Sequence, residues 1–248
     1  MKKGSTVFVV LLLAVCGAPG VFAQSGSDFE VTTANGQVTI TRYKGNAAAV
    51  SIPATIGGKP VVGIGGQAFS DCKDITSVSI PEGVISIGGT VFLDCTGLTS
   101  VSISASVTSI GFGAFLGCTG LTSIVVDTNN NHYTSRDDVL FNKKGSQLIQ
   151  YPAGKQERQY AIPEGVTHIV SWAFIDCTSL SSVSIPGSVT RIWLDAFDGC
   201  TALTSIRIGA NVALDRSFSN NFDAYYNTKG KKAGLYTFRN GAWSYAAQ

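Results

Sequence analysis

Five cysteines are the residues whose type and spacing most directly suggest chemistry. They stand at positions 72, 95, 118, 177 and 200, so three of the four gaps are 23 residues. Regularly spaced thiols suggest either disulfides or a metal site. The chain has no Cys-x-x-Cys and no paired histidines, which disfavours metal. Copies in stacked units point the same way, which does not suit the disulfide dihedral. We therefore interpret the five as buried thiols that pack as small apolar residues.

Other residue types that could carry catalysis are not arranged for it. His132 and His168 have no neighbouring carboxylate in their own segments, and no Gly-x-Ser-x-Gly elbow is present. Asp137 and Asp138 are adjacent, so on a strand they point to opposite faces. Gly88-Gly89 lacks the strand-to-helix context of a phosphate loop. The sequence predicts no enzyme, no metal and no cofactor.

Bulky side chains that depart from their sister positions are the candidates for partner binding. Elsewhere these positions hold Gly, Ser, Thr or Asp, whereas Trp and Arg are enriched at binding hot spots. The candidates are Phe112, Trp172, Arg191, Trp193 and Arg207. Trp172 and Trp193 fall on consecutive repeats, so we expect them to lie near each other. The alternative is local repacking, because aromatic rings also fill gaps.

The cysteine period belongs to a longer repeat that must position these side chains. It reads Ala-Phe-x-x-Cys-x-x-Leu-Thr-Ser-Val-x-Ile, which predicts a solenoid of stacked 23-residue coils. Val101 and Ile103 alternate with serines, as in a half-buried strand, and Pro81, Pro163 and Pro186 end such strands. The Ala-Phe-x-x-Cys stretch predicts a short helical turn. The fold class is a β-rich solenoid with short parallel strands, and its outward Ser and Thr predict a flat ribbon without a deep pocket.

These residues resemble the BspA-type leucine-rich repeat, whose consensus runs Ile-Pro-x-x-Val-Thr-x-Ile-Gly-x-x-Ala-Phe-x-x-Cys-x-x-Leu-Thr-x-Val. The match extends over residues 51–208. The resemblance implies adhesion, since BspA-type proteins are associated with binding host matrix and with contact between cells.

The ends predict export and capping. Residues 1–23 read as a signal peptide, with Lys2 and Lys3 before a short apolar run and cleavage after Ala23. Lipidation of Cys16 is the alternative, since Leu-Ala-Val-Cys is similar to a bacterial lipobox. Asn-Gly turns predict a cap hairpin in residues 24–50 and a closing hairpin in the C-terminal cap, residues 209–248.

The repeat is interrupted once. The 59-residue gap between the third and fourth of the regular cysteines is two periods plus 13 residues. Residues 125–161 therefore form one enlarged repeat, which contains a hairpin between 138–141 and 148–151. The solenoid spans residues 51–208, and the enlarged repeat is a second place to look for a partner.

Composition limits the function further. Net charge is +2 and charged residues are 14%, which argues against nucleic acid or an anionic membrane as partner. The leading hypothesis is an exported, monomeric, non-enzymatic solenoid that contacts an extracellular protein or glycan, at the cell surface, in the periplasm or secreted. The alternative is a structural envelope-associated spacer without a specific ligand.

Overall fold

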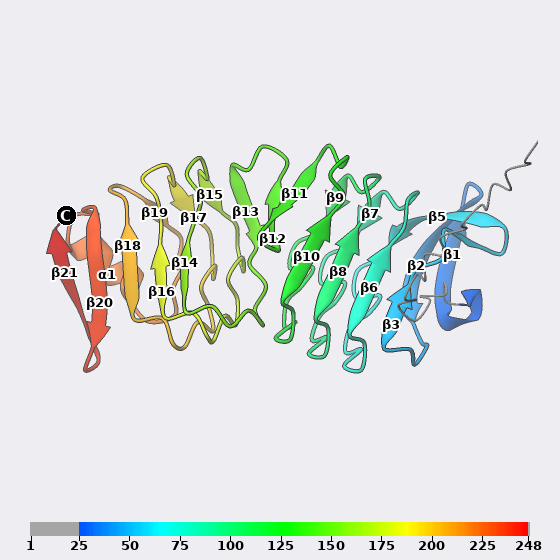
Figure 1. Ribbon diagram of the computed structural model, residues 1–248, viewed down its shortest axis with the longest axis horizontal. Coiled ribbons are helices and arrows are strands. Elements are labelled where there is room, and N and C mark those ends of the chain that lie inside the picture. Colours follow the sequence, from blue (N-terminus) through cyan, green and yellow to red (C-terminus); the bar gives the residue numbers. More distant parts are fainter. Residues whose placement is uncertain (1–24, 248) are drawn as a thin grey trace, which may run out of the picture.

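The computed structural model describes residues 25–247 as an elongated β-solenoid (Figure 1). Its strands lie side by side along the long axis, and one coil follows another from the N-terminal to the C-terminal end. Each regular coil contributes one strand to a broad ribbon, a two-residue strand to a second side, and a turn to a third side. The predicted solenoid with 23-residue coils is confirmed.

The ribbon is built from the Ser-Val-Ser-Ile segments. Within each strand the Val and Ile side chains are buried and the serines point outward, as the period of two requires. Matching residues of adjacent coils pair in parallel, for example Val78 with Val101. The first ribbon sheet contains β3 (Ala49–Ser51), β6 (Ser77–Ile80), β8 (Ser100–Ile103) and β10 (Ser123–Val126). The second contains β14 (Gln159–Ala161), β16 (Ser182–Ser184), β18 (Ser205–Ile208), β20 (Gly234–Arg239) and β21 (Ala242–Ala247).

The second side carries very short parallel strands whose isoleucines point into the core. Ile87 pairs with Ile110, and Ile169 pairs with Ile192. The strands of the first half are β5 (Lys59–Ile64), β7 (Ser86–Ile87) and β9 (Ser109–Ile110). Those of the second half are β13 (Gln147–Gln150), β15 (His168–Ile169), β17 (Arg191–Ile192) and β19 (Ala213–Leu214).

The third side consists of the Ala-Phe-x-x-Cys turns. The helical turn expected there is a run of single i→i+3 hydrogen-bonded turns, because every second N–H donates instead to the next coil. Phe69 N–H donates to Val91, and Phe92 N–H donates to Ala114. The phenylalanine rings stack behind these bonds, with centroids 4.5 Å apart for Phe174 and Phe197.

The cysteine column lies beside this stack, and all five described thiols are free. Cys95, Cys118, Cys177 and Cys200 are buried, whereas Cys72 in the first turn is half-buried. The Cys95 thiol lies 2.9 Å from the carbonyl oxygen of Phe69, one coil away, and other coils repeat this contact. Cys95, Cys118 and Cys200 therefore donate to the main chain of the preceding coil, whereas Cys72 and Cys177 donate to a carbonyl two residues earlier in their own coils. All five pack as small apolar groups.

Of the five described thiols, we expect only that of Cys72 to react with iodoacetamide in the native protein at pH 8, because thiolate is the reactive form. Burial, with a smaller contribution from Cys72, raises the pKa of Cys95 from 9.0 to about 12. The unfolded chain thus releases this thiol proton first, so the contribution of Cys95 to stability is constant below pH 9.0 and falls as the pH rises toward 12. Mass spectrometry of alkylated peptides and urea unfolding across this pH range test both statements. Equal labelling of all five thiols would contradict them.

Hairpins and one helix close the two ends of the stack, as Figure 1 shows in blue and in red. At the N-terminal end, η1 (Gly26–Asp28) precedes β1 (Phe29–Ala34) and β2 (Gln37–Tyr43), and β4 (Thr55–Ile56) folds back on β5. At the C-terminal end, α1 (Phe222–Thr228) precedes the antiparallel pair β20 and β21. None of the described helices has the length and apolar character to cross a membrane. The signal peptide and Cys16 lie outside the described residues.

One coil is irregular and divides the core. It comprises residues 123–158, which is 36 residues against the usual 23. It contains β11 (Tyr133–Arg136) and β12 (Val139–Asn142), and β12 pairs antiparallel with both β11 and β13. The buried side chains form one cluster on each side of it, and β12 contributes Leu140 to the first and Val139 with Phe141 to the second.

Candidate functional site

The irregular coil cuts one corner of the solenoid short. In regular coils the phenylalanine stands five positions after the inward isoleucine, as Phe92 does after Ile87 and Phe115 after Ile110. In the irregular coil the equivalent residues are Leu148 and Tyr151, which are only three apart. The irregular coil is therefore longer in total and two residues shorter at this corner.

The short corner follows from the way β13 is paired. Gln150 stands where the repeat has alanine, and it is the register partner of Leu140 on β12. Tyr151 returns to the regular pattern, since its N–H donates to Ala173 at 2.7 Å and its ring stacks on Phe174. Gly154 N–H then donates to Leu121 of the preceding coil. The main chain of the irregular coil is thus bonded to the preceding and the following coil, but at the shortened corner it leaves a space between these two coils.

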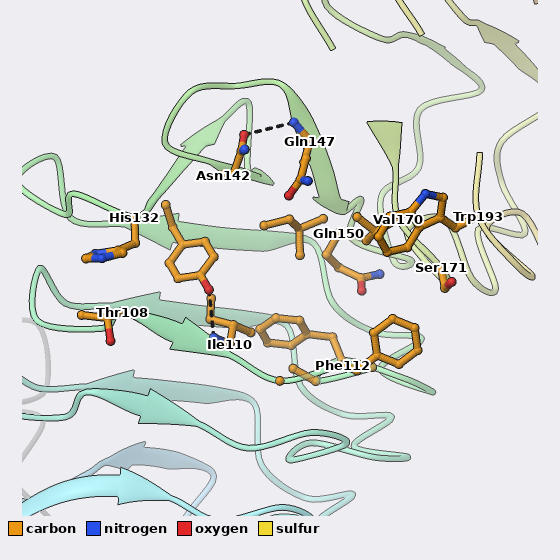
Figure 2. A pocket seen from close by; sticks show the side chains of 16 residues that line it. Thr108, Ile110, Phe112, His132, Asn142, Gln147, Gln150, Val170, Ser171 and Trp193 are labelled. Carbon is orange, nitrogen blue, oxygen red and sulfur yellow. Dashed lines mark hydrogen bonds between the residues drawn. The ribbon is translucent and has the colours of Figure 1, made fainter. Parts of the chain in front are cut away.

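A cleft of about 340 Å³ occupies this corner (Figure 2). Its walls come from residues 110–115 of the preceding coil, from β13 and the hairpin before it, and from Val170, Ser171 and Trp193 of the following coils. Phe112 and Trp193 lie at one end of the cleft and His132 at the other. The lining contains no Lys, Arg, Asp or Glu. The size is at the lower end of the range for small-ligand pockets. The flat surface predicted from the sequence concerned the ribbon, and this cleft lies at a corner away from it.

Several polar side chains of the cleft already have partners within the protein. The Tyr133 hydroxyl accepts from Ile110 N–H at 3.0 Å, and Asn142 Oδ1 accepts from Gln147 N–H at 3.0 Å. Gln150 Nε2 donates to the carbonyl oxygen of Tyr151 at 3.1 Å. These bonds hold the walls in place, and they leave the side chains of His132, Gln147 and Ser171 available to a ligand.

Aromatic rings form the mouth of the cleft. Phe112 is 55% exposed, and its ring centroid lies 4.6 Å from that of Trp172 in the second half of the molecule. Trp172 adopts a left-handed backbone (φ 62°), as do the residues at this position of other coils, such as Thr90 and Gly113. A bulky residue rarely adopts this conformation. Here it places the Trp172 ring against Phe112 at the mouth of the cleft.

Trp193 forms the other aromatic wall and occupies the consensus glycine position. Its ring meets His168 edge to face, with centroids 6.5 Å apart. Its Nε1 is buried and has no acceptor among the described residues.

The five residues predicted to bind a partner do not all lie together. Phe112 and Trp193 line the cleft, and Trp172 contacts Phe112 across its mouth, so the two tryptophans belong to one region through different partners. Arg191 is an exposed residue of β17 whose Nε donates to Asp215 at 2.7 Å. Arg207 points outward from the ribbon on β18, away from the other four. Gln150, Val170 and Ser171 were not predicted, although the short step from Leu148 to Tyr151 is visible in the sequence.

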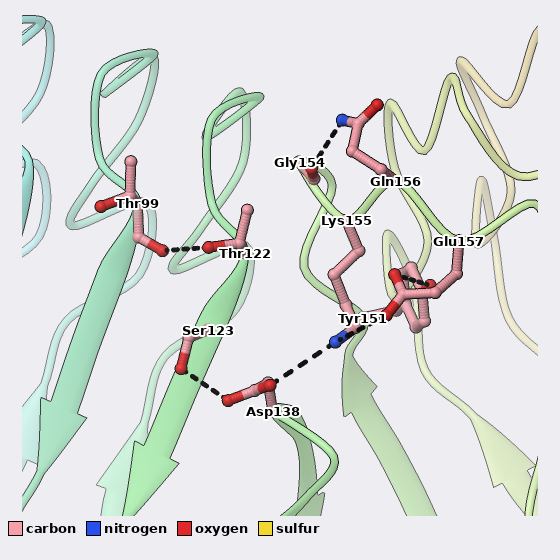
Figure 3. A network of polar contacts seen from close by, with 9 residues as sticks. All are labelled: Thr99, Thr122, Ser123, Asp138, Tyr151, Gly154, Lys155, Gln156 and Glu157. Atoms are coloured by element: carbon pink, nitrogen blue, oxygen red, sulfur yellow. Dashed lines mark hydrogen bonds and ion pairs between the residues drawn. The ribbon is translucent and has the colours of Figure 1, made fainter.

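A polar network fastens the inserted hairpin to the ribbon (Figure 3). Ser123 Oγ on β10 donates to Asp138 at 2.6 Å, and Lys155 Nζ lies 3.6 Å from Asp138 and 3.3 Å from Glu157. The Lys155 side chain is only 11% exposed, which strengthens these ion pairs relative to surface pairs. Burial and then Glu157 raise the pKa of the Tyr151 hydroxyl, so it stays protonated. Within residues 25–247 no three His, Cys, Asp or Glu side chains are grouped to hold a metal ion.

Comparison with solved structures shows similar solenoids in bacteria. The leucine rich repeat protein of T. pallidum (TpLRR) is 25% identical, with a TM-score of 0.56, over 84% of this chain and 96% of its own. A leucine-rich repeat protein from Bacteroides ovatus is 29% identical, with a TM-score of 0.53, over 79% of this chain and 49% of its own. The pneumococcal vaccine antigen PcpA shares the fold at 18% identity, with a TM-score of 0.53, over 80% and 71%. Comparison with curated proteins gives no match.

The family model settles the relationship. The model described as the BspA type leucine rich repeat region matches residues 43–157 and 153–240 in six copies, which together cover most of the chain. These ranges contain every wall of the cleft and both of its neighbouring coils. The chain belongs to the BspA type leucine rich repeat family.

Proposed function

We propose that this protein is an exported, non-enzymatic adhesion protein that binds an extracellular protein of a host matrix or of another cell through the cleft. The observation that carries the proposal is the cleft itself, with Phe112 and Trp193 on its walls and Trp172 at its mouth. Leucine-rich repeat proteins mediate protein binding and are typically non-enzymatic. The apolar run after Lys2 and Lys3 supports export, with lipidation of Cys16 or cleavage after Ala23 as its two routes.

The energetics favour a site at the aromatic mouth over the polar ribbon. An exposed phenylalanine beside two tryptophans offers a large apolar area that water does not solvate well, and such rings dominate binding energy at interfaces. The ribbon instead presents serines, of which Ser102 donates to Ser79 of the preceding coil. Arg191 is engaged with Asp215 and Arg207 lies on the ribbon, so neither is part of the proposed site.

Binding to immobilised collagen, laminin and fibronectin tests the proposal. We expect the double variant Phe112→Ala with Trp193→Ala to lose at least about 10-fold in affinity, which corresponds to one exposed hot spot or more. The variant Trp172→Ala with Trp193→Ala tests the tryptophan pair in the same way. Arg207→Ala on the ribbon is the matched control and should bind as the unaltered protein does.

Two results would contradict this function. Unchanged binding by the cleft variants, with loss in Arg207→Ala, would move the contact surface to the ribbon. Absence of binding to every matrix protein, together with an even distribution of the protein through the cell envelope, would favour the spacer. Circular dichroism of each variant separates loss of binding from loss of fold.

A further inference from the structure

The break in the repeat leaves main-chain donors facing the cleft. In the other coils, the N–H at the phenylalanine position donates to the next coil, as for Phe69, Phe92, Tyr151, Phe174 and Phe197. Phe115 is the exception among the described residues, because its N–H has no protein acceptor. Gly113 N–H, two residues earlier, also has none, and neither does Trp172 N–H at the same position of a later coil, although Thr90 N–H there donates to Phe112. Among the described residues, the Phe115 donor is therefore the one that distinguishes this coil.

The cause is the short corner. Gln150 stands where the acceptor of Phe115 N–H belongs, but it is paired with Leu140 on β12. The two residues that would continue the corner beside Gly113 are missing from the irregular coil. Phe115 is only 3% exposed and lines the cleft, so a hydrogen-bond donor is turned toward a partly buried space. Buried N–H groups without partners are rare in proteins, so the buried Phe115 N–H marks where an acceptor fits, and the half-buried Gly113 N–H lies two residues away.

We propose that the cleft binds a short, uncharged peptide segment that takes the place of the missing corner and accepts hydrogen bonds from Gly113 and Phe115. This proposal rests on the proposed function and specifies the chemistry of its ligand. The donors alternate along the chain, at residues 113 and 115, as do the carbonyl groups of Phe112 and Ala114 that accept from Thr90 and Phe92 in an intact coil. The bound peptide thereby continues the ladder that the irregular coil interrupts.

The walls favour peptide over glycan or charged ligands. No Lys, Arg, Asp or Glu lines the cleft, so a charged segment entering it would lose hydration without gaining a partner. The side chains of Tyr133, Asn142 and Gln150 are bonded inside the protein, whereas those of His132, Gln147 and Ser171 have no partner among the described residues. The main-chain donors of Gly113 and Phe115 are therefore what favours a peptide over a glycan. Phe112 and Trp193 instead offer apolar faces to the side chains of a peptide.

A peptide copied from a regular corner is the direct probe. Residues 87–92 have the sequence Ile-Gly-Gly-Thr-Val-Phe and form this corner in an intact coil. We expect the acetylated and amidated hexapeptide to shift the amide resonances of Gly113 and Phe115 downfield and to slow their hydrogen exchange. The same peptide with an alkene in place of its Val-Phe amide bond removes one acceptor and should bind at least about 10-fold more weakly.

A variant with a lengthened corner tests the geometry from within the chain. Two glycines inserted between Ile149 and Gln150 restore the five-residue step, so the cleft is filled and hexapeptide affinity falls by at least about 10-fold. The same insertion between Lys144 and Gly145, in the turn between β12 and β13, is the control and should leave affinity unchanged. The amide shifts of the unaltered protein remain a test if the lengthened corner does not fold.

The outcomes separate this proposal from the function on which it rests. Absence of amide shifts at Gly113 and Phe115 up to about 5 mM hexapeptide overturns the peptide site. Shifts caused by N-acetylglucosamine trimer but not by the hexapeptide overturn it in favour of a glycan. If the Phe112 and Trp193 variants lose matrix binding while the hexapeptide is inert, adhesion stands and the peptide mode fails. If the hexapeptide binds and no matrix protein does, the reverse holds.

Discussion

Replacing Phe197 by alanine is expected to lower the free energy of unfolding by about 3–5 kcal/mol. Its ring is 1% exposed and stacks between Phe174 and Phe218, with both centroids 4.5 Å away. Because coils contact only their neighbours, a cavity here weakens two interfaces at once. Equilibrium urea unfolding followed by circular dichroism measures the change.

Phe112→Ala removes the same atoms from an exposed ring and is the matched control. That ring is 55% exposed and contacts Trp172 at the mouth of the cleft, so the expected loss is below about 1 kcal/mol. Similar losses for the two variants would show that the phenylalanine stack is not the main source of stability.

Gly88→Ala is expected to destabilise the first half by about 2–3 kcal/mol through overpacking. A Cβ at this position would lie 2.4 Å from the nitrogen of Gly66 and 2.5 Å from the carbonyl carbon of Gly65, both in the main chain of the preceding coil. Main-chain atoms cannot move aside as a flexible side chain can, so the coils must separate. Urea unfolding of the variant measures the loss.

Gly187→Ala provides the control for this substitution. Its Cβ would have no neighbour within 4 Å, and the expected change lies within about 0.5 kcal/mol. A stable Gly88→Ala protein would mean that adjacent coils can shift apart at little cost. The second half carries Val170 and Trp193 at the position of Gly88, and both of these side chains reach into the cleft.

The regular coils are readable from sequence because each position repeats the same environment. A column of isoleucine, phenylalanine or cysteine indicates an inward position, and Ser-Val-Ser-Ile gives the strand and its buried face directly. The cysteine column also conveys that the thiols pack side by side. All of these inferences follow from contacts between adjacent copies of the repeat.

The parts that sequence does not reveal are those outside the repeat. β11 has no alternating apolar pattern, and none of its four residues is buried. The seven residues of α1 lack a side-chain cap and are held by Phe222 and Tyr226 against Tyr236. Both elements are therefore determined by tertiary packing, which overrides local propensity.

Part of the cleft can be predicted by counting the positions between the inward aliphatic residue and the aromatic residue of each coil. The shortened step from Leu148 to Tyr151 is present in the sequence, but the pairing of Gln150 with Leu140 depends on how the hairpin folds back. The separation of Arg207 from the tryptophans has a similar origin. Arginine is a residue type that is enriched at binding hot spots, whereas the place of Arg207 on β18 puts its side chain on the outer face of the ribbon, away from the cleft.

The irregular coil has a consequence for how the chain reaches its native pairing. Near-identical coils can slip by one whole repeat and still match Ser to Ser and Ile to Ile, which would trap a misaligned stack. Residues 123–158 match only their own neighbours, through Tyr133 to Ile110 on one side and Tyr151 to Ala173 on the other. A slipped arrangement loses these bonds. The irregular coil thus fixes the register of the stack, because each regular coil then has a defined position relative to it.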